Sequence, residues 1–285
     1  MSLMKNYKNK VTFVVCTCCR LESFIKSMEN FFENCLDHEL IYEYIVFDDS
    51  SSDDERNFML EKYPKFNFIF KKFSEKGHAK SLNMIPKYVK TKYFINWEDD
   101  TEFIYPRNYI SESIDILESQ NAKNHNIKQV LFNDSGFSYY QKNDKNLYLE
   151  SPTPIRLHTI DDESLLPESA DKFIVGFHHW PGYSDNAYLM HTDVISKVGN
   201  FIEESSTSEV DFSIRFRNLG FKTCYLVGTG LRWNSKVSAY VLNNQNRWWD
   251  NCIIGVELAQ LKYIFTHFFE FKTWKHVWYM IIGKI

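Results

Sequence analysis

Short apolar runs alternate with segments of helical periodicity along the first hundred residues. The run VTFVVC, at residues 11–16, is typical of a buried strand. Apolar side chains then recur at helical spacing at Leu21, Phe24, Ile25, Met28, Phe31, Phe32 and Cys35. The order repeats, with strands predicted at residues 42–47, 67–70 and 92–97 and helices around residues 58–60 and 80–88, the last interrupted by Pro86. This alternation predicts an α/β fold with a mostly parallel sheet covered by helices.

The second half of the chain is less regular. Residues 119–172 mix a short predicted strand, at 129–132, with loops rich in Asn, Asp and Pro. Regular signals return as a strand at 188–190, a helix at 210–219 and a strand at 222–227. No linker divides the chain clearly, so we expect a smaller mixed region that belongs to the same domain.

Charged residues cluster directly after the predicted strands. The clusters are Cys18-Cys19-Arg20, Asp48-Asp49, Lys71-Lys72 and Glu98-Asp99-Asp100. Ligands of open α/β sheets bind outside the carboxyl ends of the strands, so these clusters should gather at one ligand-binding edge.

The acids after residue 97 are the clearest sign of chemistry. In YFINWEDDTEF, at residues 93–103, an apolar strand runs into three consecutive carboxylates. Like charges repel one another and are costly to desolvate. A bound Mg²⁺ or Mn²⁺ would remove the conflict, because these ions prefer oxygen ligands and bridge carboxylates to phosphates.

Structural explanations also exist for the acidic clusters. Glu98 to Asp100 could form a solvated turn, and residues 48–54 could cap the following helix. Ser208-x-x-Asp211 fits a capping box, in which Asp211 only completes the helix start.

Composition narrows the classes of function. The chain has 285 residues and a formal net charge of −4, which gives no reason to expect nucleic-acid binding. Residues 1–10 do not resemble a signal peptide, and no apolar run approaches the roughly 18 residues of a membrane span. The 6 cysteines are scattered, which favours reduced thiols. We therefore expect a cytoplasmic protein.

Five segments in order resemble the motifs of GT-A-fold, inverting glycosyltransferases of family 2. The segments are VTFVVCTCCR at 11–20, IVFDDSSSDD at 45–54, GHAKSLN at 77–83, FINWEDDTEF at 94–103 and SEVDFSIRFRNLGFK at 208–222. The first resembles a strand that ends in Thr-x-Asn-Arg, with Cys19 in place of Asn, and the fourth resembles the Asp-x-Asp metal motif. The resemblance implies a Rossmann-like sheet with a nucleotide-sugar-binding half at residues 1–118 and an acceptor-binding half at 119–250.

The resemblance also implies roles for individual residues. Asp48 or Asp49 should contact the nucleotide base, in a pocket that Thr17 and Arg20 line. Asp100 should bind Mn²⁺ or Mg²⁺ directly, and Glu98 should contact the metal, the ribose or water. The remaining donor-site residues would be Lys72, Asn83 and Asp99.

Two further roles concern the acceptor side and the metal. Glu209 aligns with the acid that deprotonates the acceptor hydroxyl, with Asp211 as the rival base. The family often carries a late His as a metal ligand, and here Asn234 or water would take its place.

The sequence thus predicts a metal-dependent transferase that moves a single sugar, from a UDP-sugar in the favoured case, to a hydroxyl acceptor. The acceptor would be a polysaccharide or other glycan, a glycolipid or a glycoprotein. One alternative is a nucleotidyltransferase, although TCCRLES lacks the Gly-rich basic loop expected for triphosphate binding. The other is a silent sugar-binding or scaffold protein with a degraded site.

The last part of the chain, residues 251–285, has an aromatic helical pattern. The stripe consists of Leu261, Ile264, Phe265, Phe268, Trp274, Val277, Trp278 and Ile281, and the segment is basic. Residues 259–282 would pack on the domain, form a homodimer or contact an anionic membrane surface peripherally.

Overall fold

The computed structural model describes residues 10–134, 148–149, 153–160, 162–173, 178–203, 205 and 207–234. The predicted segment 251–285 and its contact region 259–282 lie outside these residues. No helix in the described ranges combines the length and the hydrophobicity that crossing a membrane requires. The cysteines within them form no disulfide with one another.

The strands of the main sheet come from both halves of the chain. They are β1 (Val11–Thr17), β2 (Ile41–Asp48), β3 (Phe66–Phe70), β4 (Tyr93–Glu98), β6 (Ile127–Leu131), β7 (Tyr148–Leu149), β8 (Ile155–Leu157), β9 (Tyr188–His191) and β10 (Lys222–Leu226). Their order across the sheet, for the described part of the chain, is β3-β2-β1-β4-β9-β6-β10-β8-β7. β1 to β4 are parallel, β9 is antiparallel to both β4 and β6, and β10 is parallel to β6. This confirms the predicted α/β fold with a mostly parallel sheet.

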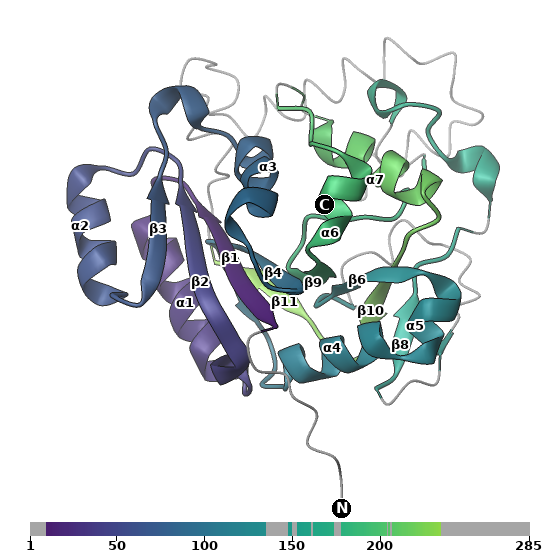
Figure 1. Cartoon of the computed structure of the whole chain (residues 1–285), viewed down its shortest axis with the longest axis horizontal. Coiled ribbons are helices and arrows are strands. Elements are labelled where there is room, and N and C mark those ends of the chain that lie inside the picture. The colour runs from purple at the N-terminus through teal and green to yellow at the C-terminus, as the bar shows by residue number, and fades with distance from the viewer. Residues whose placement is uncertain are drawn as a thin grey trace, which may run out of the picture.

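Helices cover both faces of the sheet. They are α1 (Leu21–Asn34), α2 (Asp53–Lys62), α3 (His78–Tyr88), α4 (Tyr109–Glu118), α5 (Gln120–His125), α6 (Asp193–Val198) and α7 (Ser208–Asn218). α3, α6 and α7 pack on one face, together with Val14 of β1, whereas α1, α2 and α4 pack on the other, together with Phe13 and Val15 (Figure 1). Neighbouring residues of β1 thus point into separate cores, which explains why most of this strand is apolar.

Local sequence explains several element boundaries. The Ser/Asp cluster forms a capping box at α2: Ser52 Oγ accepts from the Glu55 amide at 3.3 Å, and Glu55 Oε2 accepts from the Ser52 amide at 2.8 Å. The prediction that Pro86 interrupts the next helix is wrong, since α3 continues to Tyr88. A proline in the last turn removes little helical hydrogen bonding.

A second, two-stranded sheet lies beside the acidic cluster. β5 (Thr101–Phe103) and β11 (Leu231–Trp233) pair antiparallel, with Thr101 opposite Trp233. This pairing brings Asn234 next to the turn that follows β4. The predicted boundary at residues 118–119 falls between α4 and α5, and the main sheet takes strands from both sides of it. The division into two functional halves stays a prediction.

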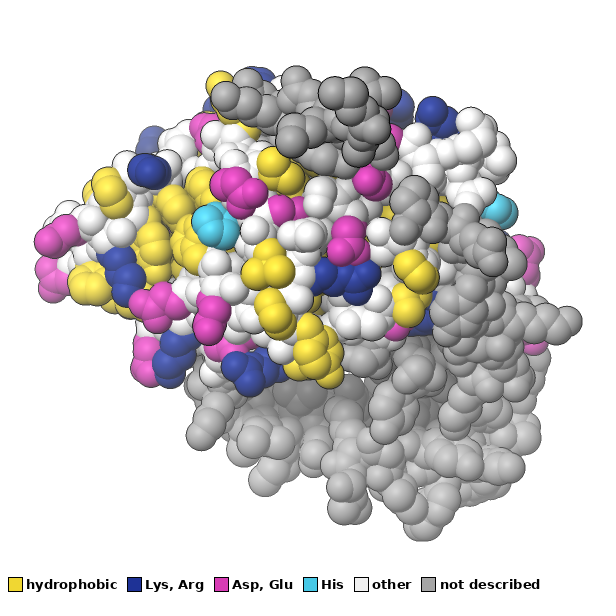
Figure 2. Space-filling view, turned by 90° about the horizontal axis from the view of Figure 1, so that it is seen from below, with side chains coloured by type: hydrophobic (Ala, Val, Ile, Leu, Met, Phe, Trp, Pro, Cys, Tyr) yellow, Lys and Arg dark blue, Asp and Glu magenta, His cyan; other side chains and the backbone are white. Residues whose placement is uncertain are grey.

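Acidic, basic and hydrophobic side chains are interspersed on the face seen from below in Figure 2. The described part of that face therefore does not carry a single sign of charge.

Candidate active site

The charged clusters meet at one edge of the sheet, where β1, β2 and β4 end. Thr17 pairs with Asp48 across β1 and β2, and Cys16 pairs with Glu98 across β1 and β4. The Asp49 amide also donates to the Thr17 carbonyl at 2.8 Å. The parallel register alone thus brings three of the predicted site segments together.

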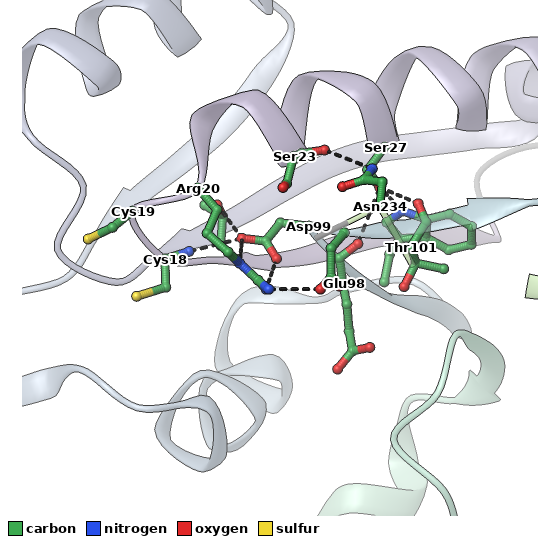
Figure 3. Close-up of polar contacts among 12 residues, drawn as sticks. Cys18, Cys19, Arg20, Ser23, Ser27, Glu98, Asp99, Thr101 and Asn234 are labelled. Carbon is green, nitrogen blue, oxygen red and sulfur yellow. Dashed lines mark hydrogen bonds and ion pairs between the residues drawn. The ribbon is translucent and has the colours of Figure 1, made fainter. Parts of the chain in front are cut away.

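Asp99 is the buried centre of this edge. One of its oxygens, Oδ2, accepts hydrogen bonds from Thr17 Oγ1 at 2.8 Å, from the Cys18 amide at 3.1 Å and from Arg20 Nε at 3.2 Å. Its other oxygen is paired with the Arg20 guanidinium (Figure 3). Burial raises the pKa of Asp99 to about 6, although Arg20 and Thr17 act to lower it. Asp99 therefore fixes the loop between β1 and α1 and orients Arg20.

Arg20 extends this network to Asp100, which is partly accessible. Its Nη1 donates to Asp100 Oδ2 at 2.8 Å, and the Asp100 side chain is 14% exposed. Asp99 and Asp100 thus differ in environment although they are adjacent in sequence: one is an internal anchor and the other reaches the surface of the site.

Asn234 lies directly against Asp100. Its amide donates to the Asp100 carbonyl at 2.8 Å, and its Nδ2 donates to Glu102 Oε1 at 3.0 Å and to the Ser23 carbonyl at 3.3 Å. Figure 3 shows it beside Ser23, Ser27 and Thr101. Its Oδ1 is buried without a hydrogen-bond partner. A buried amide oxygen without a hydrogen-bond donor is a ligand type that hard cations accept.

Protein ligands for such a cation are few. Within the described ranges, no group of three or more Asp, Glu, His and Cys side chains is arranged to hold a metal ion. A cation at Asp100 would therefore depend on the amide oxygen of Asn234 and on oxygens from a ligand or water.

The acids at the end of β2 are buried and partly paired. Asp48 Oδ2 accepts from Arg56 Nε at 2.7 Å, while its Oδ1 has no hydrogen-bond partner. Asp49 accepts from the Gly77 amide at 2.6 Å and forms an ion pair with Lys71 at 2.5 Å. Both carboxylates precede the helix start, so the capping box at Ser52 does not account for them.

The predicted basic and amide contacts differ in accessibility. Lys71 is buried and donates to Ser81 Oγ at 2.7 Å, whereas Lys72 is exposed. Asn83 bonds the Phe201 backbone in both directions, at 3.0 and 2.7 Å, and thereby fixes α3 to the loop after α6. The side-chain amide of Asn83 therefore uses both its nitrogen and its oxygen in this contact.

Glu209 lies at the start of α7 and faces the site. Its Oε1 accepts from the Asp185 amide at 2.7 Å and from Ser184 Oγ at 3.2 Å. Burial, and then the nearby Asp185 carboxylate, raise the pKa of Glu209 to about 8. Gln129, which is fully buried, anchors Ser184 by bonds to its carbonyl at 2.7 Å and from its amide at 3.2 Å.

Asp211 has a different environment. Its Oδ2 pairs with Arg215 at 2.6 Å, four residues along the same helix. The capping-box interpretation of Ser208-x-x-Asp211 is wrong, because α7 begins at Ser208 itself and Thr207, at the N-cap, makes no side-chain cap. This geometry favours Glu209 over Asp211 as an acceptor-side base.

Sequence reasoning missed two residues of the site, His78 and Asp185. His78 Nε2 and Asp185 Oδ2 are 3.2 Å apart, and their side chains are 42% and 14% exposed. Burial acts to lower the pKa of His78, but the hydrogen bonds to Asp185 and Cys16 outweigh it and raise the pKa well above its ordinary value. His78 stands inside the GHAKSLN motif, which was the available signal, whereas Asp185 precedes β9 and belongs to none of the five motifs.

Glu98 adjoins this pair. Burial raises its pKa to about 7; His78 acts to lower it, and Asp100, Asp185 and Asp99 act to raise it. This edge of the sheet thus holds several carboxyl groups, and the charge of each affects the pKa values of the others.

Three solved structures resemble this chain in fold. The mannosyltransferase PcManGT from Pyrobaculum calidifontis, in complex with GDP-Man and Mn²⁺, has a TM-score of 0.52 at 13% identity and covers 86% of this chain and 63% of its own. GalNAc-T7 with UDP, GalNAc and Mn²⁺ has a TM-score of 0.54 at 11% identity and covers 86% of this chain and 49% of its own. S. aureus TarS 1-349 has a TM-score of 0.50 at 12% identity, covering 82% and 63%. This chain therefore spans less than two thirds of each of these proteins, and the likeness establishes the GT-A fold.

No curated protein sequence matches the chain. The model of the family described as glycosyl transferase family 2 matches residues 12–173, which is more than half of the chain. On this match, and in agreement with the fold, the chain belongs to glycosyl transferase family 2.

Proposed function

We propose that this protein transfers a single sugar from a nucleoside-diphosphate donor to a hydroxyl group of an acceptor, with inversion at the anomeric carbon. The observation that carries the proposal is the order of groups along the sheet edge: buried acids at the end of β2, Asp100 with the unpartnered Asn234 oxygen after β4, and Glu209 beyond them. This order suits a base, a diphosphate and an acceptor hydroxyl in sequence.

The base-binding end would be formed by Asp48 and Asp49, with Thr17 and Arg20 beside them. Asp48 Oδ1 is buried without a partner, so a ligand N–H could satisfy it. The imide N–H of uracil is one such donor. We therefore choose a UDP-sugar as the first donor to test. Lys72 and Asn83 stay predictions for contacts further along the donor.

Asp100 and Asn234 Oδ1 would hold Mn²⁺ or Mg²⁺, with Glu98 as a metal, ribose or water contact. When bound, such a cation offsets the charge that develops on the leaving diphosphate. The two neighbours that carry Mn²⁺ and a nucleotide or nucleotide sugar support this choice of ion. Asp99 and Arg20 would keep Asp100 in position.

Glu209, in its ionised form, would act as the base for the acceptor. The acceptor oxygen forms a bond to the anomeric carbon while the bond from that carbon to the diphosphate oxygen breaks, and the acceptor proton moves to Glu209. Ser184 and Asp185 both donate to Oε1, which leaves Oε2 to take the proton. The acceptor would be a glycan, as in polysaccharide synthesis, or a glycolipid or glycoprotein.

The test is thermal stability with UDP, GDP, CDP, dTDP and ATP, each with and without Mn²⁺, on the wild type and on Asp100→Ala. A ligand that binds only the folded state adds about 2.7 kcal/mol of stability at a hundredfold excess over its dissociation constant. We expect one nucleoside diphosphate to raise the melting temperature only with Mn²⁺, and Asp100→Ala to abolish the effect.

Other outcomes favour other functions. A stronger response to ATP than to any diphosphate would favour a nucleotidyltransferase. Binding of a diphosphate without metal-dependent hydrolysis of the corresponding nucleotide sugar would favour a silent sugar-binding protein. No response from a folded protein would refute the donor site.

A further inference from the structure

We propose that Gln129 and Thr223 are positioning residues for Glu209, the general base of the proposed function. They hold the backbone of Ser184, and this segment in turn makes two hydrogen bonds to the Glu209 carboxylate. The inference rests on the proposed function and extends it to two residues inside the sheet that belong to none of the five sequence motifs.

Gln129 and Thr223 are polar residues inside buried strands. Gln129 belongs to β6 and Thr223 to β10, they are partners in the parallel register, and both are fully buried. Leu131 and Tyr225, two positions further along, pack in the core on the side of α7, so Gln129 and Thr223 face the same side. A buried polar side chain lowers stability unless it is hydrogen-bonded, so the contacts of this pair explain its position.

The pair holds the backbone of Ser184, which precedes β9 and lies outside every strand. Gln129 Nε2 donates to the Ser184 carbonyl at 2.7 Å, and Gln129 Oε1 accepts from the Ser184 amide at 3.2 Å. Thr223 Oγ1 donates to the same Oε1 at 2.8 Å. With two donors on its oxygen, the Gln129 side-chain amide keeps its nitrogen directed at the Ser184 carbonyl.

The peptide group between Ser184 and Asp185 transmits this contact to Glu209. The Ser184 carbonyl and the Asp185 amide belong to one planar trans peptide group, so they point in opposite directions. Gln129 binds the carbonyl end, and the amide end donates to Glu209 Oε1 at 2.7 Å. A displacement of Gln129 would therefore turn the amide away from the carboxylate.

The Ser184 hydroxyl provides the second hydrogen bond to the base. Asn186 Nδ2 donates to Ser184 Oγ at 3.0 Å, and Ser184 Oγ donates to Glu209 Oε1 at 3.2 Å. Both donors thus bind the same carboxylate oxygen. The proposed reaction uses the other oxygen, Oε2, so Glu209 is held by the oxygen that does not take the proton.

The same two hydrogen bonds favour the ionised form of Glu209, which a base requires. Burial, and then the Asp185 carboxylate, raise the pKa of Glu209 to about 8, and Glu98 acts in the same direction. The hydrogen bonds from the Asp185 amide and the Ser184 hydroxyl act to lower it. Gln129 and Thr223 thus support both the orientation and the charge of the base, through Ser184.

The experiment measures the pKa of Glu209 in the full chain without metal or nucleotide. The ¹³C signals of the glutamate carboxyl groups are followed by NMR against pH, and the Glu209 signal is identified by its absence in Glu209→Gln. The variants are Ser184→Ala, Gln129→Met and Thr223→Val, which each remove hydrogen bonds of the network, and Thr223→Ser, which keeps the hydroxyl.

The matched control is Thr12→Val. Thr12 is fully buried near the start of β1, and its Oγ1 lies 2.8 Å from Thr91 Oγ1. This substitution removes a buried hydrogen bond of the same length from a strand of the same sheet, far from the carboxyl ends of the strands.

We expect Ser184→Ala to raise the measured pKa of Glu209 by roughly 1, since it removes one hydrogen bond to the charged form. Gln129→Met should raise the pKa at least as much, and Thr223→Val by about half as much, because Gln129 keeps its own bonds to Ser184. Thr223→Ser and Thr12→Val should leave it at the wild-type value. If Gln129→Met does not fold, Ser184→Ala and Thr223→Val decide.

Two results would overturn the inference. An unchanged Glu209 pKa in Ser184→Ala and Thr223→Val means that the network does not support the charge of the base. An equal rise in Thr12→Val means that a general loss of stability, and not the contact through Ser184, changes the pKa.

A separate measurement tests the proposed function. With Mn²⁺ and UDP-glucose or GDP-mannose, release of the nucleoside diphosphate to water is measured for the wild type, Gln129→Met, Glu209→Gln and the double variant. Gln129→Met should slow the release by about tenfold in the wild type and should have no further effect in Glu209→Gln. If the pKa of Glu209 rises as expected but Glu209→Gln releases the diphosphate as fast as the wild type, the positioning of Glu209 stands and its proposed role as the base is refuted.

Discussion

The backbone amide of Asn234 donates a 2.8 Å hydrogen bond to the carbonyl of Asp100, although the two residues are 134 positions apart in the chain. The contact depends on the pairing of β5 with β11, which places the end of β11 beside the turn after β4. The side-chain oxygen of Asn234 is buried there without a hydrogen-bond donor. A buried acceptor without a partner is destabilising by itself, so we expect a ligand to satisfy it.

Replacement of Asn234 tests this explanation. In Asn234→Ala, the Mn²⁺ concentration that gives half of the nucleotide-dependent rise in melting temperature should increase by at least about tenfold. The loss of the Nδ2 bonds to Glu102 and Ser23 should cost about 1 kcal/mol of stability without ligand. Mn²⁺ titration followed by differential scanning fluorimetry measures both effects.

The control for this substitution is Asn67→Ala, which removes an exposed bond to Glu43 far from the site. It should leave the Mn²⁺ requirement unchanged. If Asn234→Ala behaves like this control while Asp100→Ala loses the metal response, Asn234 is not a ligand.

Asp99 provides a prediction about stability. In Asp99→Asn, the buried Arg20 guanidinium loses the charge of its closest partner, and the bonds from Thr17 and Cys18 to that carboxylate weaken. Breaking a buried ion pair by changing one partner costs roughly 3 kcal/mol or more. Urea denaturation should show this as a lower midpoint at an unchanged slope.

Glu22→Gln is the comparison for Asp99→Asn, because Glu22 forms an exposed i,i+4 pair with Lys26. We expect no measurable change in stability from it. A result in which Asp99→Asn is as mild as Glu22→Gln would contradict the role of Asp99 as the buried anchor of the loop.

The parallel half of the fold was predictable from sequence because its central strands, β1 and β4, are buried on both sides. Each of β1, β2 and β4 is rich in apolar residues, and the parallel register then aligns Thr17, Asp48 and Glu98 without further information. The motif at residues 208–222 likewise led to Glu209.

The rest of the site depends on contacts between distant residues. β5 and β11 have three residues each, too few for a periodic signal, so the chain alone does not reveal that Asn234 meets Asp100. Asp185 precedes β9, whose antiparallel place between β4 and β6 is a property of the whole sheet. Asp211 has a helix-start pattern, but the four-residue spacing to Arg215 decided its contact.

The difference between Glu209 and Asp211 leads to a kinetic prediction. Glu209→Gln should lower kcat by about 10²- to 10⁴-fold, the usual contribution of a general base, without changing the affinity for the donor nucleotide. Asp211→Asn should leave kcat close to the wild-type value, because Asp211 is paired with Arg215 on its own helix. Initial rates at saturating donor and acceptor provide the measurement, and a larger loss in Asp211→Asn than in Glu209→Gln would reverse the assignment.

Glu209 should also make stability depend on pH. Its pKa in the folded state is raised from 4.5 to about 8, so the folded protein binds a proton that the unfolded chain releases above about pH 4.5. The stabilisation from this proton is complete below the unfolded pKa and is lost as pH rises through about 8. Glutamine cannot ionise, so the melting temperature of Glu209→Gln should exceed that of the wild type by an amount that grows from about pH 5 to 9. Melting curves without metal or nucleotide test this, with Asp211→Asn as the control. If the difference in melting temperature between Glu209→Gln and the wild type stays constant over this pH range, the carboxyl group is not held protonated in the folded site.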